Sequence, residues 1–282
     1  MRRQISTRTF FLLAMLFLPI EAHAKILFEG FYKVEIKGVH SGYTIIRHSL
    51  DEKKNERTFA YYWMKQVGAV MTLTGVSTTS TTDFKPIRYL AWEALDGDVT
   101  YTRGVFEGGK VHVTRIVEKG NGERIVASDG KRVPSESIFS SLISQIVAAR
   151  TDYRVGEYYK FDGVAEESST FTPGLFTILE SYAVAGQTVY RVACHFLNER
   201  FVFLTTRDGE VLGTRSAPMN QITYLVSNRE EALGTFRLDE DLHVKTFGDV
   251  PKQGIGNPLA LAELSLRTLI ANSPPSVVPE RR

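Results

Sequence analysis

The chain has 282 residues, of which 43% are hydrophobic and 23% are charged, a balance typical of a folded globular protein rather than a disordered one. Its 34 lysines and arginines nearly match its 32 aspartates and glutamates, so charge gives no reason to expect nucleic acid or an anionic membrane surface as a partner. Cys194 is the single cysteine, which excludes an intramolecular disulfide.

Residues 1–24 have the pattern of a secretory signal peptide. Three arginines come first, and residues 10–20 then form an apolar run of 11 residues. This run is too short for a membrane-spanning helix, which needs about 20 residues. Ala22 and Ala24 are small residues at the two positions that a signal peptidase reads. We therefore expect cleavage near Ala24 and a soluble protein, not membrane-spanning, that is periplasmic or secreted.

Beyond the signal, apolar and polar residues alternate with a period of two, which is typical of half-buried β-strands. Tyr32, Val34 and Ile36 alternate with lysine and glutamate before a predicted turn at 38–42. Asp96 and Gly97 form a pair typical of a tight hairpin turn. Further strands are predicted at 43–50, 58–64, 69–74, 87–94, 99–106 and 111–118. The pattern predicts a meander of antiparallel hairpins.

One helix interrupts this series at residues 135–150. Ser135 follows a proline and is the predicted N-cap, and Ile138, Leu142 and Ile146 recur at helical spacing. Five serines are expected to form the cap and the polar face of this helix: Ser135, Ser137, Ser140, Ser141 and Ser144. Strands resume at 157–164, 175–184, 188–196, 201–207 and 210–216.

Because strands and helices do not alternate regularly, the predicted fold class is mainly β. We expect a large curved antiparallel sheet, either a meander or a half-barrel, with one prominent helix and a small C-terminal appendage. The predicted organisation is a signal peptide at 1–24, a β-rich domain at 25–226, the appendage at 227–272 and a disordered tail at 273–282, which is rich in proline.

The appendage begins with a short predicted helix. Ser227 is its expected N-cap, and Glu230 stands at the position that completes a capping box. At 258–270 the pattern allows two interpretations. Asn257 and Pro258 are typical of a helix start, whereas Leu264 and Leu266 alternate as they would in a strand.

No combination of side chains predicts an enzyme, a metal site or a cofactor. Cys194 and His195 are adjacent in a predicted strand and therefore point to opposite faces, so Cys194 is interpreted as a core residue rather than a nucleophile. The histidines show no spacing typical of a metal site: His40, His48, His112, His195 and His243. Two acidic groups, Glu166 with Glu167 and residues 239–241, are interpreted as solvated surface charge.

The aromatic residues of the strand at 58–64 give the only candidate binding site. Phe59, Tyr61 and Trp63 share one face of this strand, and Tyr62 and Met64 share the other. A strand that is apolar on both faces is either buried on both or lines a cavity with one of them. Two interpretations therefore stay open, a core strand and a ligand-binding face made of Phe59, Tyr61 and Trp63.

Several short segments carry a resemblance to known proteins. They are FYKV at 31–34 with Gly42 and Tyr43, DFKP at 83–86, DGEVL at 208–212, SNREEA at 227–232, and Asn257 and Pro258 ahead of LSLR at 264–267. In this order they resemble exported bacterial β-rich domains that stand alone or precede transglutaminase-like domains. The resemblance implies a curved antiparallel sheet. In the fused relatives the catalytic cysteine, histidine and aspartate belong to the following domain, so no catalytic residue is carried over to this chain.

The sequence thus predicts a non-catalytic protein of the cell envelope with a binding or accessory role, whose partner is an envelope protein, a peptide or a peptidoglycan-linked component. The alternative is a periplasmic carrier of a lipid or another apolar ligand. In that case the aromatic strand and the helix at 135–150 would line a half-barrel cavity. An enzyme would require His48, His112 or His195 to meet carboxylates in a pocket.

Overall fold

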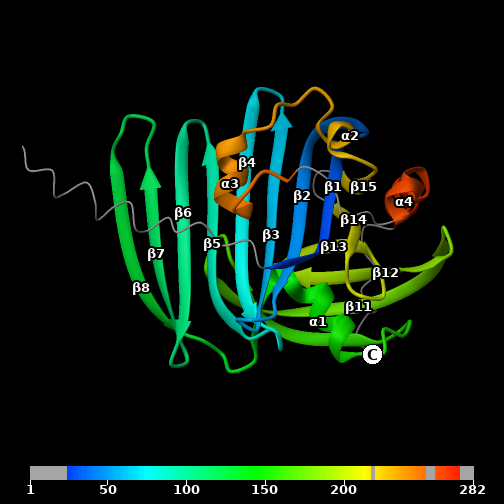
Figure 1. Cartoon of the computed structure of the whole chain (residues 1–282), viewed down its shortest axis with the longest axis horizontal. Helices are drawn as coiled ribbons and strands as arrows, with labels where there is room; N and C mark the ends of the chain where they lie inside the picture. The colour runs from blue at the N-terminus through cyan, green and yellow to red at the C-terminus, as the bar shows by residue number, and fades with distance from the viewer. Residues whose placement is uncertain (1–23, 217–219, 252–257, 274–282) are drawn as a thin grey trace, which may run out of the picture.

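The computed structural model describes residues 24–216, 220–251 and 258–273 (Figure 1). The predicted signal peptide, apart from Ala24, and the predicted tail, apart from Ser273, lie outside the described residues. Within the described residues, fifteen strands form one sheet in the order β8-β7-β6-β5-β4-β3-β2-β1-β15-β14-β13-β12-β11-β10-β9. The prediction of a mainly β fold with one large curved antiparallel sheet is confirmed. Among the described strands, only β9 and β10 pair in parallel.

Two meanders make up this sheet. The first contains β1 (Lys25–Ile36), β2 (Val39–Asp51), β3 (Glu56–Val67), β4 (Val70–Thr81), β5 (Pro86–Leu95), β6 (Asp98–Glu107), β7 (Lys110–Glu118) and β8 (Arg124–Arg132). The second contains β9 (Ser137–Phe139), β10 (Tyr158–Ala165), β11 (Thr170–Val184), β12 (Gln187–Phe196), β13 (Glu199–Thr205), β14 (Val211–Ser216) and β15 (Gln221–Val226). The first and last strands pair with each other, with Phe31 opposite Val226, and so join the two meanders.

The sheet curls until its second half faces its first. In Figure 1 the strands β2 to β8 run upright, whereas β11 and β12 cross the lower part of the view. The phenyl ring of Phe139 in β9 packs edge-on against Tyr89 of β5 and Phe106 of β6. The hydroxyl groups of Tyr89 and Ser169 are 2.6 Å apart. The edge of the second half therefore lies against the inner face of the first, which gives the sheet a barrel-like shape.

Glycines opposite aromatic residues help the strands to curve. Gly75 lies opposite Trp92, and a Cβ atom at Gly75 would stand only 2.3 Å from the indole nitrogen. Gly174 lies opposite Phe161, and a Cβ atom there would stand 2.1 Å from the phenyl ring. In both pairs the ring covers the glycine backbone, a known way of stabilising a bent sheet. A side chain at either glycine would displace the ring.

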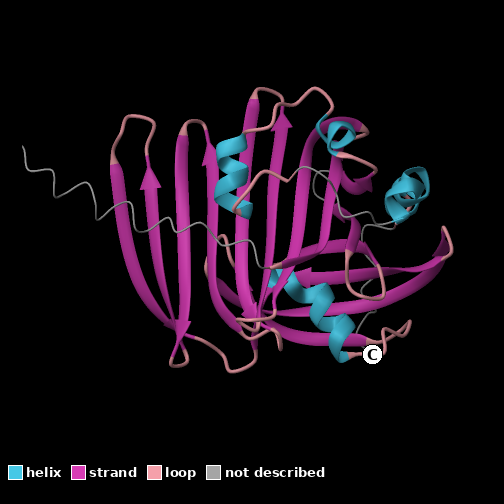
Figure 2. Cartoon of the chain, in the orientation of Figure 1, coloured by secondary structure: helices cyan, strands magenta, loops and turns pink. Residues whose placement is uncertain are grey.

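The main helix begins later than predicted. Residues 135–150 were expected to be one helix, but Ser137–Phe139 is strand β9, Ser140–Leu142 is a single 3₁₀ turn, and α1 spans Ile143–Arg150. Ser135 is not its N-cap, because the preceding strand residues pair with β10. The apolar side chains at 138, 139, 142 and 143 suit both structures, and strand pairing decides between them. α1 packs on the inner face of the sheet, apart from the other helices (Figure 2).

Three short helices, α2 (Arg229–Leu233), α3 (Glu240–Phe247) and α4 (Glu263–Ala271), cover the outer face of the sheet. The undecided segment 258–270 is helical, since a 3₁₀ turn at Pro258–Ala262 leads directly into α4. The predicted cap of α2 is wrong by one residue. The side chain of Asn228 accepts the hydrogen bond from the Glu231 amide, and Glu231 rather than Glu230 reaches back to Ser227. No helix in the described ranges is long and apolar enough to cross a membrane.

Some strand limits also differ from the prediction. The expected turn at 38–42 is a tight turn at Lys37 and Gly38, both with positive φ, so β2 already begins at Val39. β4 continues to Thr81 through a serine- and threonine-rich stretch whose polarity hides its strand character. β8 and β15 were not predicted. β8 is exposed at an edge of the sheet, whereas all six residues of β15 are buried.

Candidate functional site

A cavity of about 480 Å³ lies between the two halves of the curled sheet. This volume falls within the range of small-molecule pockets, roughly 300–1,000 Å³. Side chains from β1, β2, β3, β10, β12, β13, β14 and β15 surround it, and α1 with the preceding turn closes one side. The cavity therefore depends on segments from nearly the whole chain.

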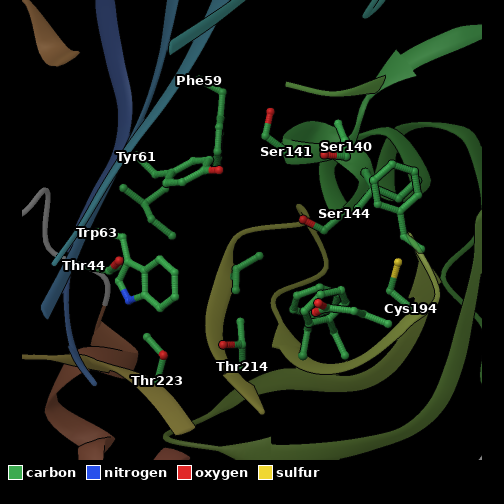
Figure 3. Close-up of a pocket in the computed structure, with 18 of the residues that line it drawn as sticks. Thr44, Phe59, Tyr61, Trp63, Ser140, Ser141, Ser144, Cys194, Thr214 and Thr223 are labelled. Carbon is green, nitrogen blue, oxygen red and sulfur yellow. The ribbon is translucent and has the colours of Figure 1, made fainter. Parts of the chain in front are cut away.

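The first wall of the cavity is the aromatic face of β3. Phe59, Tyr61 and Trp63 all line the space, together with Thr44 and Ile46 of the neighbouring β2 (Figure 3). They share this face because alternate residues of a strand point the same way. The structure thus brings the three predicted candidate residues to one cavity.

The opposite face of β3 packs into the outer core. Tyr62 and Met64 are buried there, and the ring of Tyr62 contacts His243 of α3 and Trp92 of β5. The strand is therefore packed on its outer face and lines a cavity with its inner face. Of the two open interpretations, this arrangement matches the strand that lines a cavity with one face. That this face binds a ligand stays a prediction.

The second wall comes from the other half of the sheet. It contains the rings of Phe161, Phe196, Phe201 and Phe203, and the thiol of Cys194. Burial raises the pKa of the Cys194 thiol to about 12, so this cysteine is protonated at neutral pH. His195 is exposed on the other face of β12, which confirms that the two residues do not form a dyad.

Part of the cavity lining is exposed to solvent, with charged residues nearby. Leu197 and Glu199 line the space and are also exposed to solvent. Across from them on β3, the Lys65 ammonium lies 4.6 Å from the centroid of the Trp63 ring. Burial lowers the pKa of Lys65, and the charge of Glu199 acts against this shift. Trp63 is half-buried and therefore has one side in the cavity lining and Lys65 beside its ring.

Polar groups approach the cavity from two sides. On the helix side these are Ser140, Ser141, Ser144 and Glu167. On the side of β14 and β15 they are Thr214, Gln221 and Thr223. The lining contains no lysine or arginine among the described residues, and its charged members are Glu167 and Glu199.

The prediction that Glu166 is solvated surface charge is wrong. Its side chain is only 1% exposed and accepts hydrogen bonds from the hydroxyls of Ser140 (2.7 Å) and Ser141 (2.6 Å). Burial and the neighbouring Glu167 carboxylate raise the pKa of Glu166. Two adjacent acidic residues in a turn are typical of a protein surface. The sequence pattern did not reveal the burial of Glu166, because the two serines that bind it lie about 25 residues earlier in the chain.

The serines around α1 hold the fold together rather than forming a polar face. Ser140 and Ser141 bind Glu166, and the Ser144 hydroxyl donates to the Gly209 carbonyl at 2.7 Å. Ser137 and Ser144 are buried. Glu167 remains exposed at the cavity edge, where it accepts a hydrogen bond from the Tyr61 hydroxyl. The Tyr61–Glu167 bond links the first half of the sheet to the second.

None of the histidines in the described part of the chain lines this cavity. In the part of the chain that the structure describes, no group of three or more His, Cys, Asp or Glu side chains could hold a metal ion. His48 is buried beside Phe59, and His243 on α3 is buried against Tyr62 of β3. His112 and His195 are exposed on β7 and β12. Residues 239–241 are exposed as predicted, and Asp239 caps α3.

Fold and cavity together define a β-barrel-like protein whose open sheet surrounds a ligand-sized space. The structure is similar to the crystal structure of a β-barrel-like protein of domain of unknown function DUF1849 from Brucella abortus, with a TM-score of 0.51, 10% sequence identity and coverage of 73% of this chain and 98% of that one. A DUF1089 family protein from Pseudomonas aeruginosa gives a TM-score of 0.39 at 12% identity, with coverage of 64% and 91%. No family model and no curated protein matches the sequence.

At 10% identity, the first of these comparisons shows a shared fold and assigns no ligand. The resemblance to domains that precede transglutaminase-like domains stays a prediction.

Proposed function

We propose that this protein binds a predominantly apolar small molecule or lipid chain in the cavity of its curved sheet, as a carrier or receptor rather than an enzyme. One observation carries the proposal: aromatic side chains from both halves of the sheet face a single space of about 480 Å³. Protein interiors are normally packed to the density of organic crystals, and a space of this size among aromatic rings is typical of a binding site for an apolar ligand.

Two further observations support a binding role without catalysis. The thiol that faces the cavity, Cys194, is kept protonated by burial and has His195 on the opposite face of its strand. The carboxylate nearest to the serines, Glu166, already accepts hydrogen bonds from both of them. These groups support the structure around the cavity instead of offering a free nucleophile and base.

Of the two roles that the sequence suggests, the cavity favours the carrier over the accessory protein. The signal-like residues 1–24 support a location in the periplasm or outside the cell. In that aqueous compartment an apolar compound requires a protein to shield it from water, because exposed apolar surface is unfavourable there. A barrel-like sheet with an internal apolar cavity is suited to this task.

The two tryptophans of the chain provide a direct test. Trp63 lines the cavity, whereas Trp92 is buried on the outer face and donates its indole N–H to Thr246 at 3.0 Å. A brominated long-chain fatty alcohol quenches tryptophan only on contact. We expect saturable quenching in the wild-type protein, with one ligand bound per chain, and none in Trp63→Phe, which keeps Trp92.

Equal quenching of both proteins would contradict the proposal, because the bromines would then reach Trp92 rather than the cavity. Absence of saturable quenching in the wild type would also contradict it. Native mass spectrometry of the protein purified from its own source gives an independent measurement. A co-purifying apolar compound, lost on mild organic extraction, is the expected result.

A further inference from the structure

One side of the cavity is polar, and its polar groups lie on adjacent strands. Thr214 of β14 and Thr223 of β15 are direct cross-strand partners, so their side chains stand next to each other on the inner face. Gln221 lies two residues before Thr223 and therefore points to the same face. Figure 3 shows Thr214 and Thr223 at the end of the cavity that also holds Trp63. We call Thr214, Gln221 and Thr223 the polar strip.

The side chain of Gln221 is buried without a hydrogen bond from any described residue to its amide oxygen. Its side chain is only 8% exposed, and its amide oxygen has no hydrogen-bond partner within the described residues. A buried polar atom without a partner is unfavourable, and such atoms are rare in native proteins. Because this atom belongs to a residue that lines the cavity, a ligand group in the cavity can supply the missing bond.

The charges around the cavity limit what this ligand group can be. Among the described lining residues there is no lysine or arginine, and both charged ones are glutamates. A carboxylate or phosphate group inside the cavity would therefore have no cationic lining residue to pair with and would lie near Glu167 and Glu199. A hydroxyl group fits better, since it can donate to the Gln221 oxygen and accept from a threonine hydroxyl.

We propose that the cavity takes a neutral amphiphile with a hydroxyl head group, such as a long-chain alcohol or a monoacylglycerol. The hydroxyl binds the polar strip, and the hydrocarbon chain lies between the aromatic wall of β3 and the wall formed by β10, β12 and β13. This inference rests on the proposed function and adds the chemical class of the ligand to it. It also predicts that ionised fatty acids bind less tightly than alcohols with the same hydrocarbon chain, because their head group is a negatively charged carboxylate.

Three ligands of equal chain length test the head group: decan-1-ol, its methyl ether and decanoate. Each competes at pH 8 with the environment-sensitive apolar probe N-phenyl-1-naphthylamine. We expect decanol to bind at least about tenfold more tightly than the ether and than the ionised decanoate, the ratio expected for one good hydrogen bond. In Gln221→Leu the preference for decanol over the ether should fall to about twofold or less, while the ether binds as well as before.

Matched variants separate this role from a general effect on folding. Gln66→Leu makes the same change at an exposed position near the end of β3 and should keep the full preference. Thr223→Val preserves shape, removes one hydroxyl of the polar strip and should weaken decanol binding selectively. Equal affinity of the wild type for all three ligands, tighter binding of decanoate, or an unchanged preference in Gln221→Leu would overturn the head-group assignment. Failure of the probe and all three ligands to bind would instead overturn the proposed function itself.

Discussion

Replacement of His243 by phenylalanine should leave the protein at least as stable as the wild type at pH 7 and make it more stable than the wild type in acid. His243 lies on α3 and is fully buried, with its ring centroid 4.2 Å from that of Tyr62 in an edge-to-face arrangement. Tyr43 and Phe247 complete the aromatic surroundings. Neither ring nitrogen has a hydrogen-bond partner within the described residues. A phenyl ring would fill this site without leaving polar atoms unpaired.

The pH dependence follows from the shifted pKa of this histidine. Burial lowers the pKa of His243 from 6.5 to about 4, with Asp239 opposing the shift and Arg229 adding to it. The two tyrosines that contact the ring stay uncharged, because burial raises their pKa values. The unfolded chain therefore binds a proton below pH 6.5 that the folded chain takes up only near pH 4. The wild type therefore has its full stability above pH 6.5, and proton binding to His243 in the unfolded chain lowers that stability as pH falls towards 4.

These pKa values set the size of the effect. A shift of this extent corresponds to about 3 kcal/mol in total, of which about 2 kcal/mol is lost between pH 7 and pH 5. His243→Phe removes this loss. At pH 7 it should be as stable as the wild type or up to about 2 kcal/mol more stable, since two unpaired nitrogens disappear. At pH 5 its advantage should be larger by about 2 kcal/mol.

Urea unfolding followed by far-ultraviolet circular dichroism at pH 7 and pH 5 measures these differences. His112→Gln serves as the matched control, because His112 is exposed on β7 and its replacement should change neither the stability nor its pH dependence appreciably. The reasoning is refuted if the stability difference between His243→Phe and the wild type is the same at both pH values.

Three further predictions address other parts of the molecule. Arg47→Met should cost about 3–5 kcal/mol in urea unfolding, because it removes the guanidinium that lies 2.6 Å from the buried Glu29 carboxylate; a cost below about 1 kcal/mol would contradict this. The pKa of Glu166 is raised in the folded protein, so the wild type loses stability as pH rises above 4.5. Glu166→Gln cannot ionise, and its stability relative to the wild type should therefore increase between pH 5 and pH 8. A stability difference between Glu166→Gln and the wild type that does not grow with pH would contradict the raised pKa of Glu166. Alkylation of Cys194 by iodoacetamide at pH 8 should be about 1,000-fold slower than that of a model thiol, because its pKa rises from 9.0 to about 12. A rate within tenfold of the model thiol in the folded protein would argue against a buried thiol.

Local patterns were sufficient to predict most of the strands and to group the three aromatic side chains of β3 on one face, but they left open whether that face is core or lines a cavity. Strict alternation places Phe59, Tyr61 and Trp63 on one face, and this holds whatever the strand packs against. The separation of Cys194 from His195 follows from the same geometry. The helical segment shows the limit of this reasoning. Ile138 and Phe139 suit a helix face as well as a buried strand, and only the pairing with β10 makes them strand residues.

The other wall and the polar groups of the cavity could not be predicted, because they depend on contacts between distant segments. Tyr61 and Glu167 are 106 residues apart in the sequence and meet only when the sheet curls. Glu166 looks like surface charge until Ser140 and Ser141 cover it. Nothing in the sequence pattern around Gln221 identifies it as a binding residue. It becomes notable only when its oxygen is seen to be buried and without a partner.

The seam between β1 and β15 explains why the cavity requires the whole chain. These strands, about 190 residues apart, join the meander that carries β3 to the meander that carries the phenylalanine wall. Glu35 of β1 lies at this seam, where it accepts a hydrogen bond from Tyr224 of β15 at 2.7 Å and from Arg267 of α4 at 2.8 Å. The C-terminal helix therefore braces the seam from outside. A pairing so distant in sequence is expected to form late in folding, so the ability to bind an apolar ligand should appear together with closure of this seam.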